Sequence, residues 1–179
     1  AGAVLMQYFN VTKALSKTKA CKVDGNPKTL TTLGADYDWS IMPKGGGQSA
    51  LMTAEQQDLA ARAVYDVGVC LGTSYLPDGK TAASLDDLAV VLREDCGFAD
   101  VRCATVTSET QYEALIYAQV RAGAPVLLGI ESKSEGGHVV VAVGYGEDAE
   151  KTAYTRLFMG WGGDDDFPST GIDVLPCIL

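Results

Sequence analysis

The sequence has little that could hold a metal or a cofactor. It contains one histidine, His138, and its five cysteines include no pair spaced Cys-x-x-Cys, so the ligand set of a zinc cluster is missing. The glycine run at 45–47 is not followed by Lys-Ser or Lys-Thr, which makes a flexible loop the better interpretation than a phosphate-binding loop. We expect neither a metal nor a cofactor.

Long apolar runs and an excess of basic residues are also missing. The longest apolar runs, such as residues 139–143, fall far short of the roughly 20 residues that span a membrane. Lys and Arg number 14 against 23 Asp and Glu, and the resulting net charge of −9 repels phosphate backbones. We expect no membrane span and no nucleic-acid partner. Nothing in the sequence from Ala1 onward resembles a secretory signal, as expected of either a mature form or a fragment.

The residues that are present fit one domain over 1–179. The fractions of hydrophobic residues (47%) and charged residues (21%) are ordinary for a globular chain of this length. Helix signals fill about residues 1–123 and strand signals fill residues 124–179. This order predicts the α+β class, with N-terminal helices packed on a C-terminal antiparallel sheet.

Apolar spacing and capping signals predict four helices. The first covers about residues 1–15, and its apolar pattern is already under way at Ala1, so its first turn is expected upstream. The second helix is expected to start at a capping box of Thr53 and Gln56 and to end at Gly72. The third is expected to start at Ser84 and end at Gly97, and the fourth to start at a capping box of Ser108 and Gln111 and end at Gly123. The expected inward residues are Leu59, Ala63, Val67 and Cys70, then Leu85, Leu88 and Leu92, and then Leu115, Ala118 and Ala122.

The rest of the chain divides into turns and strands. Residues 21–52 are turn-rich, and residues 72–84 form a loop of small side chains. Three runs of β-branched and aromatic residues predict strands at 126–130, 138–145 and 154–161.

The lone histidine follows two glycines at the start of a predicted strand. Gly136 and Gly137 allow a sharp backbone turn and leave open space beside the ring of His138. A histidine in such a place can act as a general base or as an imidazolium partner. A purely structural histidine is the alternative.

A second cluster, Gly160-Trp161-Gly162-Gly163, ends the next predicted strand. Consecutive strands joined by a turn usually pair, which would bring Trp161 into the sheet neighbourhood of His138. The alternative is a buried aromatic residue beside a turn.

Taken together, these segments resemble the streptopain family of papain-like cysteine peptidases. In that family a Gly-Gly-His strand precedes a Trp-Gly-Trp-Gly-Gly turn and an aspartate a few residues on, where this chain has Asp166. The resemblance extends over nearly the whole chain. Its further segments are Ala1 to Tyr8, Tyr37-Asp38-Trp39-Ser40 and Ala63-Val64-Tyr65-Asp66-Val67-Gly68-Val69.

The resemblance implies that the nucleophilic cysteine sits at the N-terminus of the first helix. The register of that helix places it about four residues before Ala1. None of the five cysteines present takes its place, so the chain is expected to be truncated and inactive by itself. His138 is then the catalytic histidine.

The resemblance also implies a peptide-binding cleft. Gly136, Gly137 and Trp161 are expected to line it. The loop 78–84 contributes four small residues, Thr81, Ala82, Ala83 and Ser84. An ordinary solvated loop leading into a helix is an equally good interpretation of this segment.

Two positions depart from the family pattern. The register of Trp161 puts Phe158 where the family has an asparagine that orients the histidine, and Met159 where it has a tryptophan. Neither side chain can accept a hydrogen bond from imidazole as an amide oxygen does.

Two main functions therefore compete. The first is a cysteine-type endopeptidase acting on peptides or proteins, secreted or in the cell envelope. The second is a catalytically inactive peptidase-like domain that binds a peptide or a partner protein. An acyl transferase or amidase on the same scaffold is a weaker third. Oligomeric state and substrate preference do not follow from the sequence.

Overall fold

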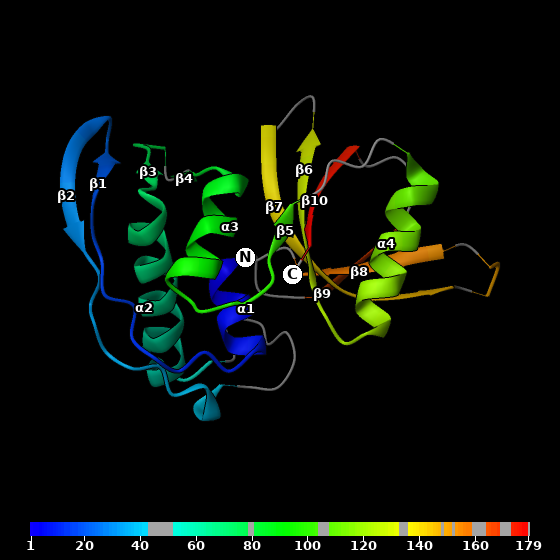
Figure 1. Cartoon of the computed structure of the whole chain (residues 1–179), viewed down its shortest axis with the longest axis horizontal. Helices are drawn as coiled ribbons and strands as arrows, with labels where there is room; N and C mark the ends of the chain where they lie inside the picture. The colour runs from blue at the N-terminus through cyan, green and yellow to red at the C-terminus, as the bar shows by residue number, and fades with distance from the viewer. Residues whose placement is uncertain are drawn as a thin grey trace. The chain divides into compact units, whose positions relative to one another are not determined.

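The structure is a computed structural model that describes residues 1–42, 52–78, 81–103, 108–132, 136–147, 149–151, 153–158, 164–168 and 173–178. It divides into two compact units (Figure 1). The amino-terminal unit holds described residues 2–42 and 52–99, and the carboxyl-terminal unit holds residues 100–178.

Helices α2 and α3 of the amino-terminal unit begin at their predicted caps. Helix α2 also ends at its predicted glycine, whereas α3 ends at Asp95, before the expected stop at Gly97. Helix α2, Ala54–Leu71, starts with a reciprocal capping box between Thr53 and Gln56 and ends at Gly72, whose φ of 69° is left-handed. Helix α3, Leu85–Glu94, starts at Ser84, whose hydroxyl accepts from two backbone N–H groups. The predicted inward residues Leu59, Ala63, Val67, Cys70, Leu88 and Leu92 are buried.

The first helix is shorter than predicted. Helix α1 covers Gly2–Tyr8 and stops because Asn10 adopts a left-handed φ of 53°. The chain then continues without regular secondary structure to β1, and Trp39 Nε1 donates to the carbonyl of Val11 at 2.7 Å. The apolar residues beyond Tyr8 therefore pack from a loop and not from a helix.

The segment read as turn-rich contains a β-hairpin. Strands β1, Thr18–Val23, and β2, Asn26–Thr31, pair antiparallel around Asp24-Gly25, both of which have positive φ. An Asp-Gly pair is the typical signal for this two-residue turn, so the part of the turn-rich segment before Thr31 forms a hairpin. The short strands β3, Ser74–Tyr75, and β4, Thr81–Ala82, complete a sheet of order β2-β1-β3-β4. A 3-10 turn, η1, covers Trp39–Ile41.

The carboxyl-terminal unit is built on a six-stranded sheet of order β5-β10-β6-β7-β8-β9. The predicted strands at 126–130, 138–145 and 154–161 correspond to β6, β7 and β8, which pair antiparallel. The strands are β5 Arg102–Cys103, β6 Val126–Ser132, β7 Gly136–Glu147, β8 Ala153–Phe158, β9 Asp164–Pro168 and β10 Asp173–Ile178. Strand β9 begins with three aspartates and β10 contains a proline, both poor strand formers, so neither was expected.

Helix α4, Glu109–Arg121, starts at Ser108 as predicted, but of its three expected inward residues only Leu115 packs against the core. Tyr112 and Ile116 are buried, whereas Ala118 and Ala122 are exposed. The larger side chains at i and i+4 bury more apolar area than two alanines and so decide which face meets the sheet. The core cluster of this unit is Tyr112, Ile116, Val126, Leu128, Val140, Ala142 and Leu157.

Candidate active site

His138 is the third residue of β7 and is half-buried. It lies opposite Ile130 of β6. Toward the start of β7 the ladder continues with Gly137 opposite Glu131 and Gly136 opposite Ser132. A Cβ built on Gly137 would meet no atom within 4 Å. Because successive residues of a strand point to opposite faces, this open space lies on the face of β7 away from the His138 ring, and open space beside the ring stays a prediction.

The strand that carries His138 packs against the core of the carboxyl-terminal unit. Val140 and Ala142 lie two and four residues farther along the same face of β7, and both belong to the core cluster under α4. A histidine on a packed strand has a fixed backbone, which is what a catalytic side chain requires.

Phe158, the residue at the family's asparagine position, lies opposite Val141 of β7. Facing residues share one face of a sheet, and successive residues alternate, so Phe158 and Val141 lie on the face opposite to that of His138. Position 158 is also three residues away along the strand, or about 10 Å. A hydrogen bond from residue 158 to the imidazole is therefore not available in this register.

The predicted loop residues lie in the amino-terminal unit. Thr81 and Ala82 form β4, where they pair with Tyr75 and Ser74. All four loop residues from 81 to 84 are exposed. The Ser84 hydroxyl accepts from the N–H groups of Asp86 and Asp87, at 3.2 and 3.4 Å, so this side chain has a structural task as the cap of α3.

Of the remaining predicted site residues, two lie in strands and two lie outside the described residues. Gly136 is the first residue of β7. Asp166 lies in β9 opposite Arg156. Trp161 and Met159 lie outside the described residues.

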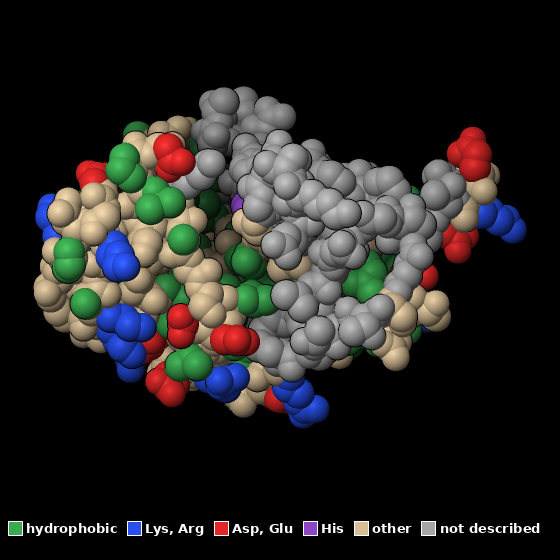
Figure 2. Space-filling view, turned by 90° about the horizontal axis from the view of Figure 1, so that it is seen from above, with side chains coloured by type: hydrophobic (Ala, Val, Ile, Leu, Met, Phe, Trp, Pro, Cys, Tyr) green, Lys and Arg blue, Asp and Glu red, His purple; other side chains and the backbone are tan. Residues whose placement is uncertain are grey.

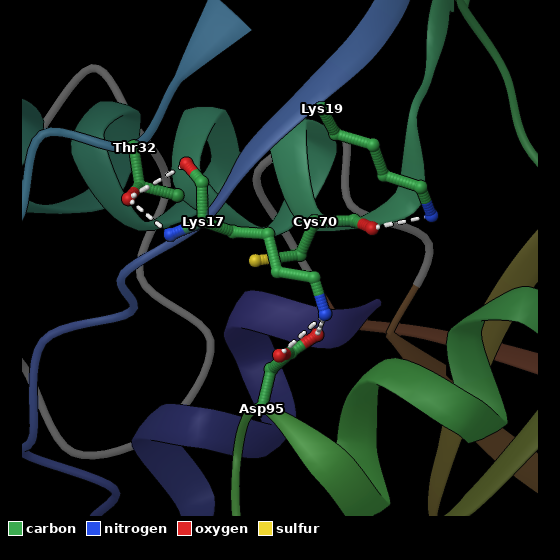
Figure 3. A network of polar contacts seen from close by, with 5 residues as sticks. All are labelled: Lys17, Lys19, Thr32, Cys70 and Asp95. Carbon is green, nitrogen blue, oxygen red and sulfur yellow. Dashed lines mark hydrogen bonds and ion pairs between the residues drawn. The ribbon is translucent and has the colours of Figure 1, made fainter.

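Cys70 is buried in the last turn of α2, the wrong end of a helix for a reactive thiolate. Its backbone carbonyl accepts from Lys19 Nζ at 3.0 Å, and Lys17 Nζ nearby pairs with Asp95 at 2.9 Å (Figure 3). Burial, followed by the charge of Asp95, raises the pKa of the Cys70 thiol to about 11. The thiol therefore stays protonated at neutral pH.

The two other cysteines whose side chains are described are no more reactive. Burial raises the pKa of Cys96 to about 12 and also raises the pKa of Cys21. Cys103 and Cys177 lie in strands β5 and β10 and lack the helix N-terminus that activates a thiol. That none of the five cysteines replaces the nucleophile stays a prediction.

A buried carboxylate that sequence reasoning did not single out joins two of the family-like segments. Asp66, on the inner face of α2, is fully buried and accepts from Leu33 N–H at 2.7 Å and from the Tyr37 hydroxyl at 2.6 Å. The Tyr37 ring stacks on Trp39 with 5.4 Å between centroids, and the Arg62 guanidinium lies 5.4 Å from the Tyr37 centroid. The signal in the sequence was a charged residue at a position one turn from the buried residues Ala63 and Cys70.

The described residues were also compared with the requirements of a metal site and of a membrane-spanning helix. No three His, Cys, Asp or Glu side chains within the described ranges are grouped so that they could hold a metal ion. Among the same residues, no helix combines the length and the apolar character needed to cross a membrane. Figure 2 shows acidic and basic side chains interspersed over the visible face of the amino-terminal unit.

The α+β fold and a histidine at the start of a packed strand are features of papain-like cysteine peptidases. The model of the Peptidase C10 family matches residues 1–167, and the chain belongs to this family, the streptopain family. Its members are cysteine peptidases and are typically extracellular. A comparison with curated protein sequences gives no match.

Proposed function

We propose that this chain is the body of a secreted cysteine endopeptidase in which His138 exchanges protons with the substrate. The observation that carries the proposal is the half-buried His138 at the start of β7, a strand whose residues Val140 and Ala142 lie in the core. Family membership supplies the reaction class, which is hydrolysis of a peptide bond by a Cys-His pair.

In the proposed mechanism a cysteine thiolate attacks the carbonyl carbon of the substrate. The His138 imidazolium then gives its proton to the leaving amine nitrogen, the C–N bond breaks, and an acyl-enzyme remains. Neutral His138 next removes a proton from water, which hydrolyses the thioester. We place the nucleophile about four residues before Ala1, at the start of the first helix, by the helix register of the family.

The binding of an extended peptide is assigned to Gly136, Gly137 and Trp161, together with the loop residues Thr81, Ala82, Ala83 and Ser84. The small, exposed side chains at 81–83 support this assignment, because they leave room for a substrate side chain. Open space at Gly137 supports an approach of the substrate backbone.

The experiment uses the parent protein with its natural residues upstream of Ala1. We expect His138→Ala to lower kcat/KM on a fluorogenic peptide by at least about 100-fold, the usual contribution of a general acid–base group. Val64→Ala, at an exposed position of α2, is the control and should leave the rate unchanged. Equal rates for the parent and His138→Ala would refute the assignment.

The rival function is a peptidase-like domain that binds peptides without cleaving them. The inert environment of Cys21, Cys70 and Cys96 favours it for the residues 1–179 taken alone. A thiol-directed covalent peptidase inhibitor should fail to label this chain. A Gly-Cys pair encoded just upstream of Ala1 supports the enzyme, and another residue at the cysteine position supports the binding domain.

A further inference from the structure

Two of the five cysteines lie directly opposite each other in the carboxyl-terminal unit. Strands β5 and β10 are antiparallel, and the register pairs Cys103 with Cys177 and Arg102 with Ile178. Facing residues of an antiparallel pair have Cα atoms about 4.5 or 5.5 Å apart, depending on the type of pair. Both values fall within the range of about 4.4–6.8 Å that a disulfide bond requires.

The other three cysteines leave this pair without competitors. Cys21, Cys70 and Cys96 are buried as free thiols, and burial raises the pKa of each. A thiol that stays protonated exchanges slowly with disulfides, because the thiolate is the attacking species. An odd number of cysteines is thus compatible with one bond and three buried thiols.

Strand β5 is a short edge strand. It is two residues long, lies at the edge of the six-stranded sheet and pairs with β10. The ion pair between Arg102 and Asp100 joins side chains that are 76% and 66% exposed, and such pairs stabilise little. A covalent bond from Cys103 would fix this edge strand to β10.

We propose that Cys103 and Cys177 form a disulfide bond that fastens β5 to β10 under oxidising conditions. The oxidant is a small disulfide such as oxidised glutathione. One cysteine thiolate attacks it, forming a mixed disulfide and releasing one glutathione thiolate. The second cysteine thiolate attacks the cysteine sulfur of the mixed disulfide and releases the other glutathione thiolate. The two cysteines lose two electrons and two protons, and oxidised glutathione becomes two thiols.

The first test counts thiols in the folded chain. After incubation with oxidised glutathione, the protein is unfolded in N-ethylmaleimide and weighed, and its peptides are mapped. We expect three maleimide adducts and a peptide joining Cys103 to Cys177. Cys103→Ser and Cys177→Ser should each lose the bridge, while the control Cys21→Ala should keep it and show two adducts. Five adducts on folded wild-type chain, or a bridge between other cysteines, overturns the proposal.

The second test measures what the bond does. We expect a reductant to lower the Tm of the oxidised wild-type protein by at least about 5 °C, because the bond closes a long loop of the chain. The same reductant should not change the Tm of Cys103→Ser. An unchanged Tm for wild type would show that the bond does not fasten the sheet. His138→Ala should form the bridge as wild type does, so this proposal and the proposed catalytic function fail separately.

Discussion

The Tyr37 hydroxyl donates to the carboxylate of Asp66 at 2.6 Å inside the amino-terminal unit. This contact ties the loop that follows the β1–β2 hairpin to the inner face of α2. A second bond to the same carboxylate, from Leu33 N–H, fixes the chain where it leaves β2. A buried carboxylate is tolerated here because both donors reach it.

We predict that Asp66→Ala lowers the free energy of unfolding by about 2–4 kcal/mol, because it leaves the buried Tyr37 hydroxyl and the part-buried Leu33 N–H without this acceptor. Tyr37→Phe removes one of the two bonds and should cost about 1–2 kcal/mol. Urea unfolding at neutral pH measures both values. Asp58→Asn, at an exposed position of the same helix, is the control and should stay within about 0.5 kcal/mol of wild type. A similar small change for Asp66→Ala would show that the carboxylate is not structural.

A second close contact in α2 involves the glycine at position 68. A Cβ built on Gly68 would clash with the Tyr75 hydroxyl oxygen. This hydroxyl is buried and has no hydrogen-bond partner among the described residues. We predict that Gly68→Ala destabilises the chain by about 1–3 kcal/mol through overpacking. Tyr75→Phe alone should be neutral or stabilising by about 1 kcal/mol, since it removes an unsatisfied buried group.

The double variant separates overpacking from helix propensity. In the Tyr75→Phe background the clashing oxygen is gone, and Gly68→Ala should then gain up to about 1 kcal/mol from the better helix former. Thermal unfolding of the four proteins gives the coupling. If Gly68→Ala costs the same in both backgrounds, the hydroxyl is not what position 68 must avoid.

The buried thiols predict that the chain loses stability in alkali. The pKa of Cys96 is raised from 9.0 to about 12 by burial, so above pH 9 the unfolded state releases a proton that the folded state retains. The stabilisation is complete below pH 9 and falls by up to about 1.4 kcal/mol per pH unit between 9 and 12. Cys96→Ala should reduce this slope.

The measurement is the free energy of unfolding in urea at pH 7, 9 and 10.5 with a reductant present. Other buried groups with raised pKa, such as Cys70 and Tyr112, contribute in the same direction, so the difference between wild type and Cys96→Ala isolates one thiol. Parallel slopes for the two proteins would contradict the burial of Cys96.

Local signals were predictable from the sequence, and contacts between distant residues were not. The caps at Thr53, Ser84 and Ser108 depend on residues two or three positions away, and each was found where predicted. The burial of Asp66 depends on a tyrosine 29 positions earlier, and no local pattern reveals such a partner.

The same reason limits what could be predicted at the candidate site. The histidine, its glycines and its strand follow from local patterns. The position of Phe158 depends on the register between β7 and β8, which includes an irregularity between Ala142 and Gly144. A register is set by packing on both faces of a sheet, and a shift of one residue exchanges those faces.

The register between β7 and β8 and the family resemblance predict opposite effects of an asparagine at position 158. If residue 158 oriented the histidine, Phe158→Asn would restore the family's amide and raise kcat/KM of the parent protein by tenfold or more, as expected for about 1.4 kcal/mol of transition-state stabilisation. Because Phe158 faces Val141 and lies on the side of the sheet away from His138, we predict no gain, with kcat/KM within about threefold of wild type.

Phe158→Leu is the matched control, because it changes the volume of the side chain without adding an amide. Both variants remove aromatic contacts of a half-buried residue, so their loss of stability should be similar. Peptide-hydrolysis rates and melting temperatures of the two variants, measured side by side, decide the matter. A gain in kcat/KM for Phe158→Asn alone would mean that β8 pairs with β7 in a different register and that the amide reaches the imidazole.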